Sequence, residues 1–148
     1  SFFLKVDKVR DWLWAEGVGS NKTDSGNSIA IDVCDAIYMT WEYRNPMVFP
    51  GANASNGTDT LSHKQKRDVF VAKMNNQGDW KWAKRARSEG TDKPYQMSVD
   101  INKQVFLGGT SSVEITFSNG LVVGPQIAGD TTSSSCVAHL DGATYTGC

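Results

Sequence analysis

An internal repeat is the feature of this sequence that most constrains its fold. A single shift, which places Phe2 on Phe70, lays the first part of the chain on the second part without a gap. This shift of 68 residues is the repeat interval between the first two copies, and a third copy begins near Cys136 at a slightly shorter interval, where residues 137–141 align with residues 71–75. The other matched aromatic pairs include Trp12 with Trp80, Trp14 with Trp82, and Phe49 with Phe117. A fixed period of this kind is typical of folds in which equivalent units stack on one another.

Each full copy is predicted to form four short β-strands separated by turns. Short apolar runs are bounded by Gly, Asn, Asp and Ser, which is the pattern of strands joined by hairpin turns. The apolar spacing of a helix is not sustained over any window of helical length, so we expect an all-β chain. The expected strands are residues 2–6, 11–15, 28–32 and 36–40 in the first copy, and 69–74, 79–84, 96–100 and 104–108 in the second.

The sequence therefore predicts tandem four-stranded antiparallel blades, as an incomplete β-propeller or as part of a larger one. The first blade and a long inter-blade loop occupy residues 1–68, the second blade occupies 69–135, and a truncated third copy occupies 136–148. Two copies do not close a ring of about four to eight blades. Closure then requires further blades in a longer chain or in other chains, because open blade edges aggregate.

The second copy resembles a known repeat family. Residues 69–74 (VFVAKM), 78–84 (GDWKWAK), 97–100 (MSVD) and 105–109 (VFLGG) are similar, in this order, to the SBBP repeat of seven-bladed β-propeller proteins. The resemblance covers roughly two thirds of the chain, although the spacing between copies is longer than in the family. It implies a propeller scaffold that is found mainly in extracellular and surface proteins, and it transfers no catalytic motif.

Aromatic residues are the main candidates for the core between blades. Tryptophans two residues apart on a strand share one face of the sheet, which suits burial against a neighbouring blade. The predicted inter-blade core residues are Phe2, Trp12, Trp14, Phe70, Trp80 and Trp82. Trp41 and Tyr43 are candidate ligand contacts if the chain instead binds glycans.

The charge and motif content names no catalytic, cofactor or metal site. The net charge is -1, with 15 Lys and Arg against 16 Asp and Glu, so the whole molecule lacks the positive field that attracts nucleic acid. The chain has no apolar run long enough to span a bilayer, which requires about 20 residues. His63 and His139 lie outside any catalytic or metal-binding motif, and the carboxylates do not form a calcium-loop pattern. We therefore expect no enzymatic activity, no cofactor, no nucleic-acid partner and no membrane insertion.

Cysteines and glycosylation sequons favour a secreted or surface-associated protein. Three N-x-S/T sequons begin at Asn21, Asn53 and Asn56. A disulfide between Cys136 and Cys148 would close a short loop and leave Cys34 free or paired outside this segment; three unlinked thiols are the alternative.

The predicted function is that of a non-enzymatic structural or interaction module. Its expected partners are other protein subunits or further blades of the same protein, because equivalent blades present equivalent surfaces. Two alternatives stay open: a glycan-binding propeller module, and an accessory module of a larger extracellular enzyme. Glycan screening and the full-length sequence would separate them.

Overall fold

The computed structural model describes residues 2–22, 24–52, 58–62, 66–117, 120–124 and 134–140, with only the backbone described at 58, 59 and 134–140. This part of the chain is all-β, and it contains no helix. The strands are β1 (Phe2–Val6), β2 (Trp12–Gly17), β3 (Ser25–Ile31), β4 (Ile37–Tyr43), β5 (Met47–Pro50), β6 (Thr58–Leu61), β7 (Asp68–Met74), β8 (Trp80–Arg87), β9 (Asp92–Val99), β10 (Val105–Ser111), β11 (Ile115–Phe117), β12 (Val122–Val123) and β13 (Ser134–Leu140).

The strand positions repeat with the sequence. Strand β10 begins and ends one repeat interval after β4, and β7, β8, β9 and β11 follow β1, β2, β3 and β5 by nearly the same interval. The strands thus lie where the sequence predicted them, with bounds that differ by a few residues. Longer strands are expected, because hydrogen bonding to a neighbouring strand recruits flanking residues that lack a strong propensity of their own.

The hairpin turns are built in the same way in both copies. Each turn begins with an Asp or Asn whose side-chain oxygen accepts backbone N–H groups two and four residues later, or only the latter. These four residues are Asp7, Asp32, Asn75 and Asp100. In each turn the third residue after this cap has a positive φ; these residues are Arg10, Asp35, Gly78 and Lys103. Asx turns therefore determine where each hairpin reverses.

The grouping of strands into sheets differs from the predicted grouping. Strands β1 and β2 form one sheet, whereas β3 and β4 belong to a larger sheet with the order β12-β11-β8-β7-β4-β3. A third sheet has the order β13-β10-β9, and β5 pairs with β6. The four predicted blade strands of each copy are thus divided between two sheets, because β4 pairs along its whole length with β7, and β10 with β13, of the next copy. None of the sheets formed by the described strands closes on itself.

The third copy joins the third sheet in the register of the second copy. Strand β13 pairs with β10 so that Phe106 lies opposite His139, just as β7 pairs with β4 so that Tyr38 lies opposite Lys73. This pairing agrees with the sequence alignment of residues 137–141 with residues 71–75. The first strand of the second copy and the first strand of the third copy are therefore each added to the hairpin that precedes them.

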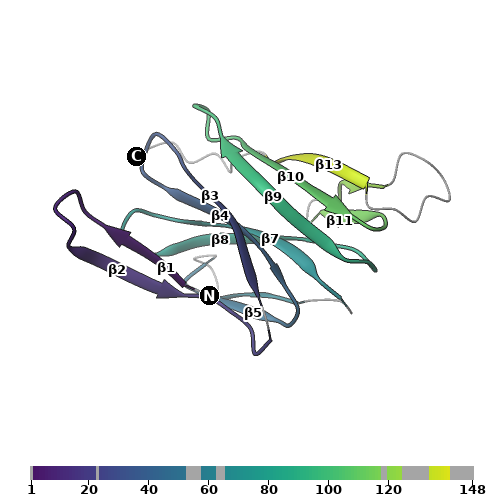
Figure 1. Cartoon of the computed structure of the whole chain (residues 1–148), viewed down its shortest axis with the longest axis horizontal. Coiled ribbons are helices and arrows are strands. Elements are labelled where there is room, and N and C mark those ends of the chain that lie inside the picture. The colour runs from purple at the N-terminus through teal and green to yellow at the C-terminus, as the bar shows by residue number, and fades with distance from the viewer. Residues whose placement is uncertain are drawn as a thin grey trace.

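The central sheet is covered on both faces. One core joins it to the β1–β2 and β5–β6 hairpins, and a second core joins its opposite face to β9 and β10 (Figure 1). The two cores are equivalent, because six buried residues of the first have buried counterparts one repeat interval later in the second. The pairs are Phe3 with Val71, Val18 with Ala86, Ile37 with Val105, Met39 with Leu107, Met47 with Ile115, and Phe49 with Phe117.

Candidate functional site

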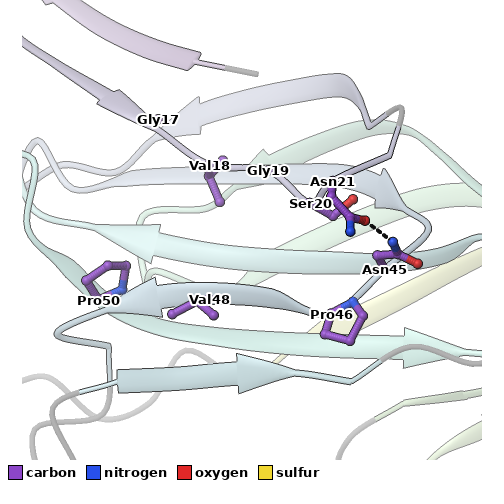
Figure 2. A pocket seen from close by; sticks show the side chains of 9 residues that line it. All are labelled: Gly17, Val18, Gly19, Ser20, Asn21, Asn45, Pro46, Val48 and Pro50. Atoms are coloured by element: carbon purple, nitrogen blue, oxygen red, sulfur yellow. Dashed lines mark hydrogen bonds between the residues drawn. The ribbon is translucent and has the colours of Figure 1, made fainter.

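A surface groove of about 390 Å³ lies between the end of β2 and strand β5 (Figure 2). Its lining residues are Gly17, Val18, Gly19, Ser20 and Asn21 on one side, and Asn45, Pro46, Val48 and Pro50 on the other. At one end, Asn45 Nδ2 donates a hydrogen bond to Asn21 Oδ1 across the groove. The volume is in the range of small-ligand clefts, and none of these lining residues carries a charge. The groove is therefore uncharged, and its polar groups are the Ser20 hydroxyl and the Asn21 and Asn45 amides.

A second groove of about 330 Å³ lies at the equivalent place in the second copy. Its lining residues are Arg87, Ser88, Glu89, Val113, Glu114 and Thr116, and each lies one repeat interval after a residue of the first groove. Three of these six side chains are charged, whereas their counterparts are Gly19, Asn21 and Pro46. The fold thus repeats the position of the groove without repeating its chemistry.

The two grooves also differ in how their walls are joined. In the second copy β11 pairs with β8, so that Thr116 lies opposite Arg87 and Phe117 opposite Ala86. In the first copy β2 ends at Gly17, and β5 pairs with β6 instead. Sequence reasoning missed both grooves; the only local signal for the first is the density of glycine and proline along its two walls.

The predicted ligand contacts Trp41 and Tyr43 are buried in the first core. The Trp41 ring stacks on Phe3 with centroids 4.2 Å apart, and the Tyr43 hydroxyl donates to the Ser62 carbonyl at 2.9 Å. Burial raises the pKa of Tyr43, and the nearby carboxylate of Asp68 raises it further. Neither ring offers a face to a ligand, because both are packed inside the protein.

The six predicted core aromatics occupy three kinds of environment. Phe70 and Trp80 are buried in the first core, where Phe49 contacts both rings edge to face. Trp14 and Trp82 are partly buried against the first and second core, respectively. Phe2 and Trp12 instead lie on the outer face of β1–β2 and are exposed. No described sheet covers that face, whereas β1–β2 itself covers the equivalent face of β7–β8.

A buried polar network links the β3–β4 turn to β7. Lys73 Nζ donates to the Tyr38 hydroxyl at 2.6 Å and to Asp32 Oδ2 at 3.4 Å, and the Tyr38 hydroxyl donates to Asp32 Oδ2 at 3.1 Å. Burial alone would raise the pKa of Asp32, but backbone N–H groups of Ala36 and Cys34, the Tyr38 hydroxyl and the Lys73 charge together lower it. Burial lowers the pKa of Lys73. The network ties together three strands of the central sheet.

A second buried carboxylate, Asp92, lies at the start of β9. Its Oδ1 accepts hydrogen bonds from Ser88 Oγ at 2.8 Å and Ser111 Oγ at 2.6 Å. Burial raises the pKa of Asp92, and the negative charge of Asp68 adds to that rise, although the two serine hydroxyls oppose it. The first copy repeats part of this arrangement, since Ser20 Oγ donates to Asp24 Oδ1 at 2.9 Å. The serine and aspartate therefore close an equivalent turn in each copy.

The predicted covalent sites are only partly within the described residues. The Asn21 side chain is exposed at the first groove, whereas Asn53 and Asn56 lie outside the described residues. Cys34 is disulfide-bonded, so the predicted free thiol and the alternative of three unlinked cysteines are wrong. The side chains of Cys136 and Cys148 lie outside the described residues, so their predicted pairing stays a prediction.

The described residues contain neither a metal-binding cluster of His, Cys, Asp and Glu side chains nor a helix that could cross a bilayer. No protein-family model matches this chain, and no curated protein matches its sequence.

Proposed function

We propose that this chain is a non-enzymatic structural and interaction module of β-propeller type, in which successive sheets stack as blades. The observation that carries the proposal is the recurrence of one inter-sheet core at the repeat interval, on opposite faces of the central sheet. A core that recurs in this way is the mark of units that stack by one geometrical rule. Such a chain adds further blades or subunits at its ends by the same rule.

The buried polar groups support a structural role. The Asx caps close hairpins, and the Asp32, Tyr38 and Lys73 network joins strands β3, β4 and β7. Ser88, Asp92 and Ser111 likewise connect the ends of β8, β9 and β10. These hydrogen bonds connect neighbouring strands, although Asp92 Oδ2 accepts none from the described residues.

A secreted or surface location is part of the proposal. Disulfides persist in oxidising compartments and are rare in the cytosol, and Cys34 is disulfide-bonded. The sequon asparagine Asn21 is exposed, as a glycosylation acceptor must be. Both observations favour passage through a secretory pathway.

The stacking is tested by truncating equivalent core residues. Phe49→Ala and Phe117→Ala are each expected to lower the free energy of unfolding by about 3–5 kcal/mol, because each removes a buried ring from one of the two cores. Urea unfolding followed by far-UV circular dichroism measures both changes, with Val48→Ala at an exposed position as the control. If Phe117→Ala were as stable as the control while Phe49→Ala was not, the two cores would not be equivalent.

The glycan-binding alternative is retained at a different site. The first groove favours it, since this groove is neutral and contains two asparagine amides. A glycan array probed with the purified chain and with Asn45→Ala tests this alternative. Selective binding that is lost in Asn45→Ala would favour a lectin, and a blank array would favour the structural role.

A further inference from the structure

The outer face of the β1–β2 hairpin is apolar and exposed. Phe2 and Trp12 are each 71% exposed, and Leu4 and Val6 extend the same surface. In the second copy the equivalent residues are Phe70, Ala72, Met74 and Trp80, and none of them is more than 5% exposed. The first copy therefore has apolar residues on a face that is buried in the second copy, but none of the described strands covers this face in the first copy.

Among the described strands, none occupies the edge of β1 at which its counterparts have a neighbour. Strand β7 pairs with β4, and β13 pairs with β10, each in the same register. Within the described part of the chain, β1 pairs with β2 alone. An unpaired strand edge is a template for adding another strand.

Two isoleucines of β3 mark the position of the absent neighbour. Ile29 and Ile31 are 57% and 61% exposed. Their counterparts in β9 are Met97, which is 5% exposed, and Val99, which is partly buried, because β9 packs against β3 and β4. The surface formed by the edge of β1 and the exposed face of β3 thus fits one specific element, a hairpin equivalent to β3–β4.

We propose that this surface binds the β9–β10 hairpin of a second copy of this chain. Strands β9 and β10 are the counterparts of β3 and β4. Within one molecule, β10 already pairs with β13, which is the counterpart of β1 in the third copy. In the complex, β1 of one molecule replaces β13 on β10 of the other. The sheet β9-β10-β1-β2 then reproduces the internal sheet β3-β4-β7-β8.

The register of this pairing follows from the internal one. Met39 lies opposite Ala72 in the β4–β7 pair, so Leu107 of one molecule lies opposite Leu4 of the other. By the same rule Val105 lies opposite Val6. The two surfaces differ, so the association is head-to-tail and produces a ring or an open chain of molecules. The inference rests on the proposed stacking function and names its partner.

Association of the full chain tests the proposal. Size-exclusion chromatography with light scattering is expected to show a mass that rises with protein concentration. Hydrogen exchange is expected to slow at residues 2–6 in the larger species. Ile29→Glu combined with Ile31→Glu changes two side chains that are exposed in the monomer, so it preserves the fold and weakens association by about tenfold or more.

Ile101→Glu is the matched control. Ile101 is 77% exposed at the β9–β10 turn, and its counterpart Val33 stays 64% exposed although the β3–β4 hairpin pairs with β7 and packs against β9. The control is therefore expected to associate like the wild-type chain.

Three results would overturn the proposal. One is a chain that stays monomeric at every concentration, and another is an oligomer that the Ile29 and Ile31 changes leave intact. The third is a longer native polypeptide in which residues 2–6 are protected at every concentration, because an upstream segment would then fill the surface. If the Phe49 and Phe117 substitutions still destabilise such a monomer equally, the stacking function stands and only the second-copy partner is wrong.

Discussion

Gly26 lies opposite Trp41 in the β3–β4 pair, and the indole occupies the space that a side chain on Gly26 would need. A Cβ on Gly26 would lie 1.8 Å from Trp41 Nε1. In the second copy the sizes are exchanged, since Pro94 lies opposite Gly109. A Cβ on Gly109 would lie 2.5 Å from the Lys93 carbonyl oxygen. Each hairpin thus keeps one small residue at this position, on alternate strands.

Gly26→Ala is expected to lower the free energy of unfolding by about 1–3 kcal/mol, the usual cost of overpacking. Trp41 cannot move aside at low cost, because its ring is stacked on Phe3 and contacts Phe70 edge to face. Chemical denaturation measures the change. Gly17→Ala is the control, since a Cβ there meets no atom within 4 Å. Equal stability of the two variants would show that the indole is free to move.

Arg10→Gly is expected to raise the free energy of unfolding by about 0.5–1 kcal/mol. Arg10 has a φ of 77°, a conformation that costs a residue with a Cβ about 1–2 kcal/mol. Glycine removes this cost, but it also raises the conformational entropy of the unfolded chain, which offsets part of the gain in stability. The second copy already has Gly78 at this position, with a φ of 95°. The reverse change, Gly78→Arg, is expected to destabilise the protein. Thermal unfolding of both variants checks the prediction, and a less stable Arg10→Gly would contradict it.

Acid is expected to weaken the network around Asp32. The pKa of Asp32 is lower in the folded state than its ordinary value of 3.8, so its stabilising contribution is complete above that value and is lost as the pH falls through the folded-state pKa. Asp32→Asn should therefore be less stable than wild type at neutral pH, with a difference that shrinks below about pH 4. Urea unfolding across this pH range measures the difference. Asp79→Asn, at an exposed turn, controls for the loss of one charge, and a gap that widened in acid would refute the assignment.

Phe2→Ala and Phe70→Ala change equivalent residues of the repeat with unequal expected effects. Phe70 is fully buried and contacts three other aromatic rings, so its truncation is expected to cost about 3–5 kcal/mol. Phe2 is exposed in the monomer, so its truncation is expected to change stability by less than about 0.5 kcal/mol. Unfolding is measured at a concentration where the chain is monomeric. A large loss in Phe2→Ala under those conditions would mean that its face is covered within one chain.

Local sequence determined much of this protein. At the hairpin turns, Asp and Asn side-chain oxygens accept hydrogen bonds from backbone N–H groups two to four residues later. Because these contacts are local, the positions of β1–β4 and β7–β10 could be predicted. The repeat interval could also be predicted, because equivalent side chains recur at equivalent places in both cores. These features depend on alternation and turn chemistry, which a short segment carries by itself.

The partition of strands into sheets was decided only by the tertiary structure. The repeat interval shows that the copies are equivalent, but it does not show which strands of neighbouring copies share a sheet. Any starting point along the repeat gives the same interval. The boundary was set by hydrogen bonds between β4 and β7, which are separated by the long connection that contains β5 and β6. The same reason explains Phe2 and Phe70, which share a local sequence pattern but differ in burial, and Trp41, which is buried because Phe3 covers it. The burial of a residue depends on which sheet packs against its strand. The residues next to it in the sequence do not determine which sheet that is.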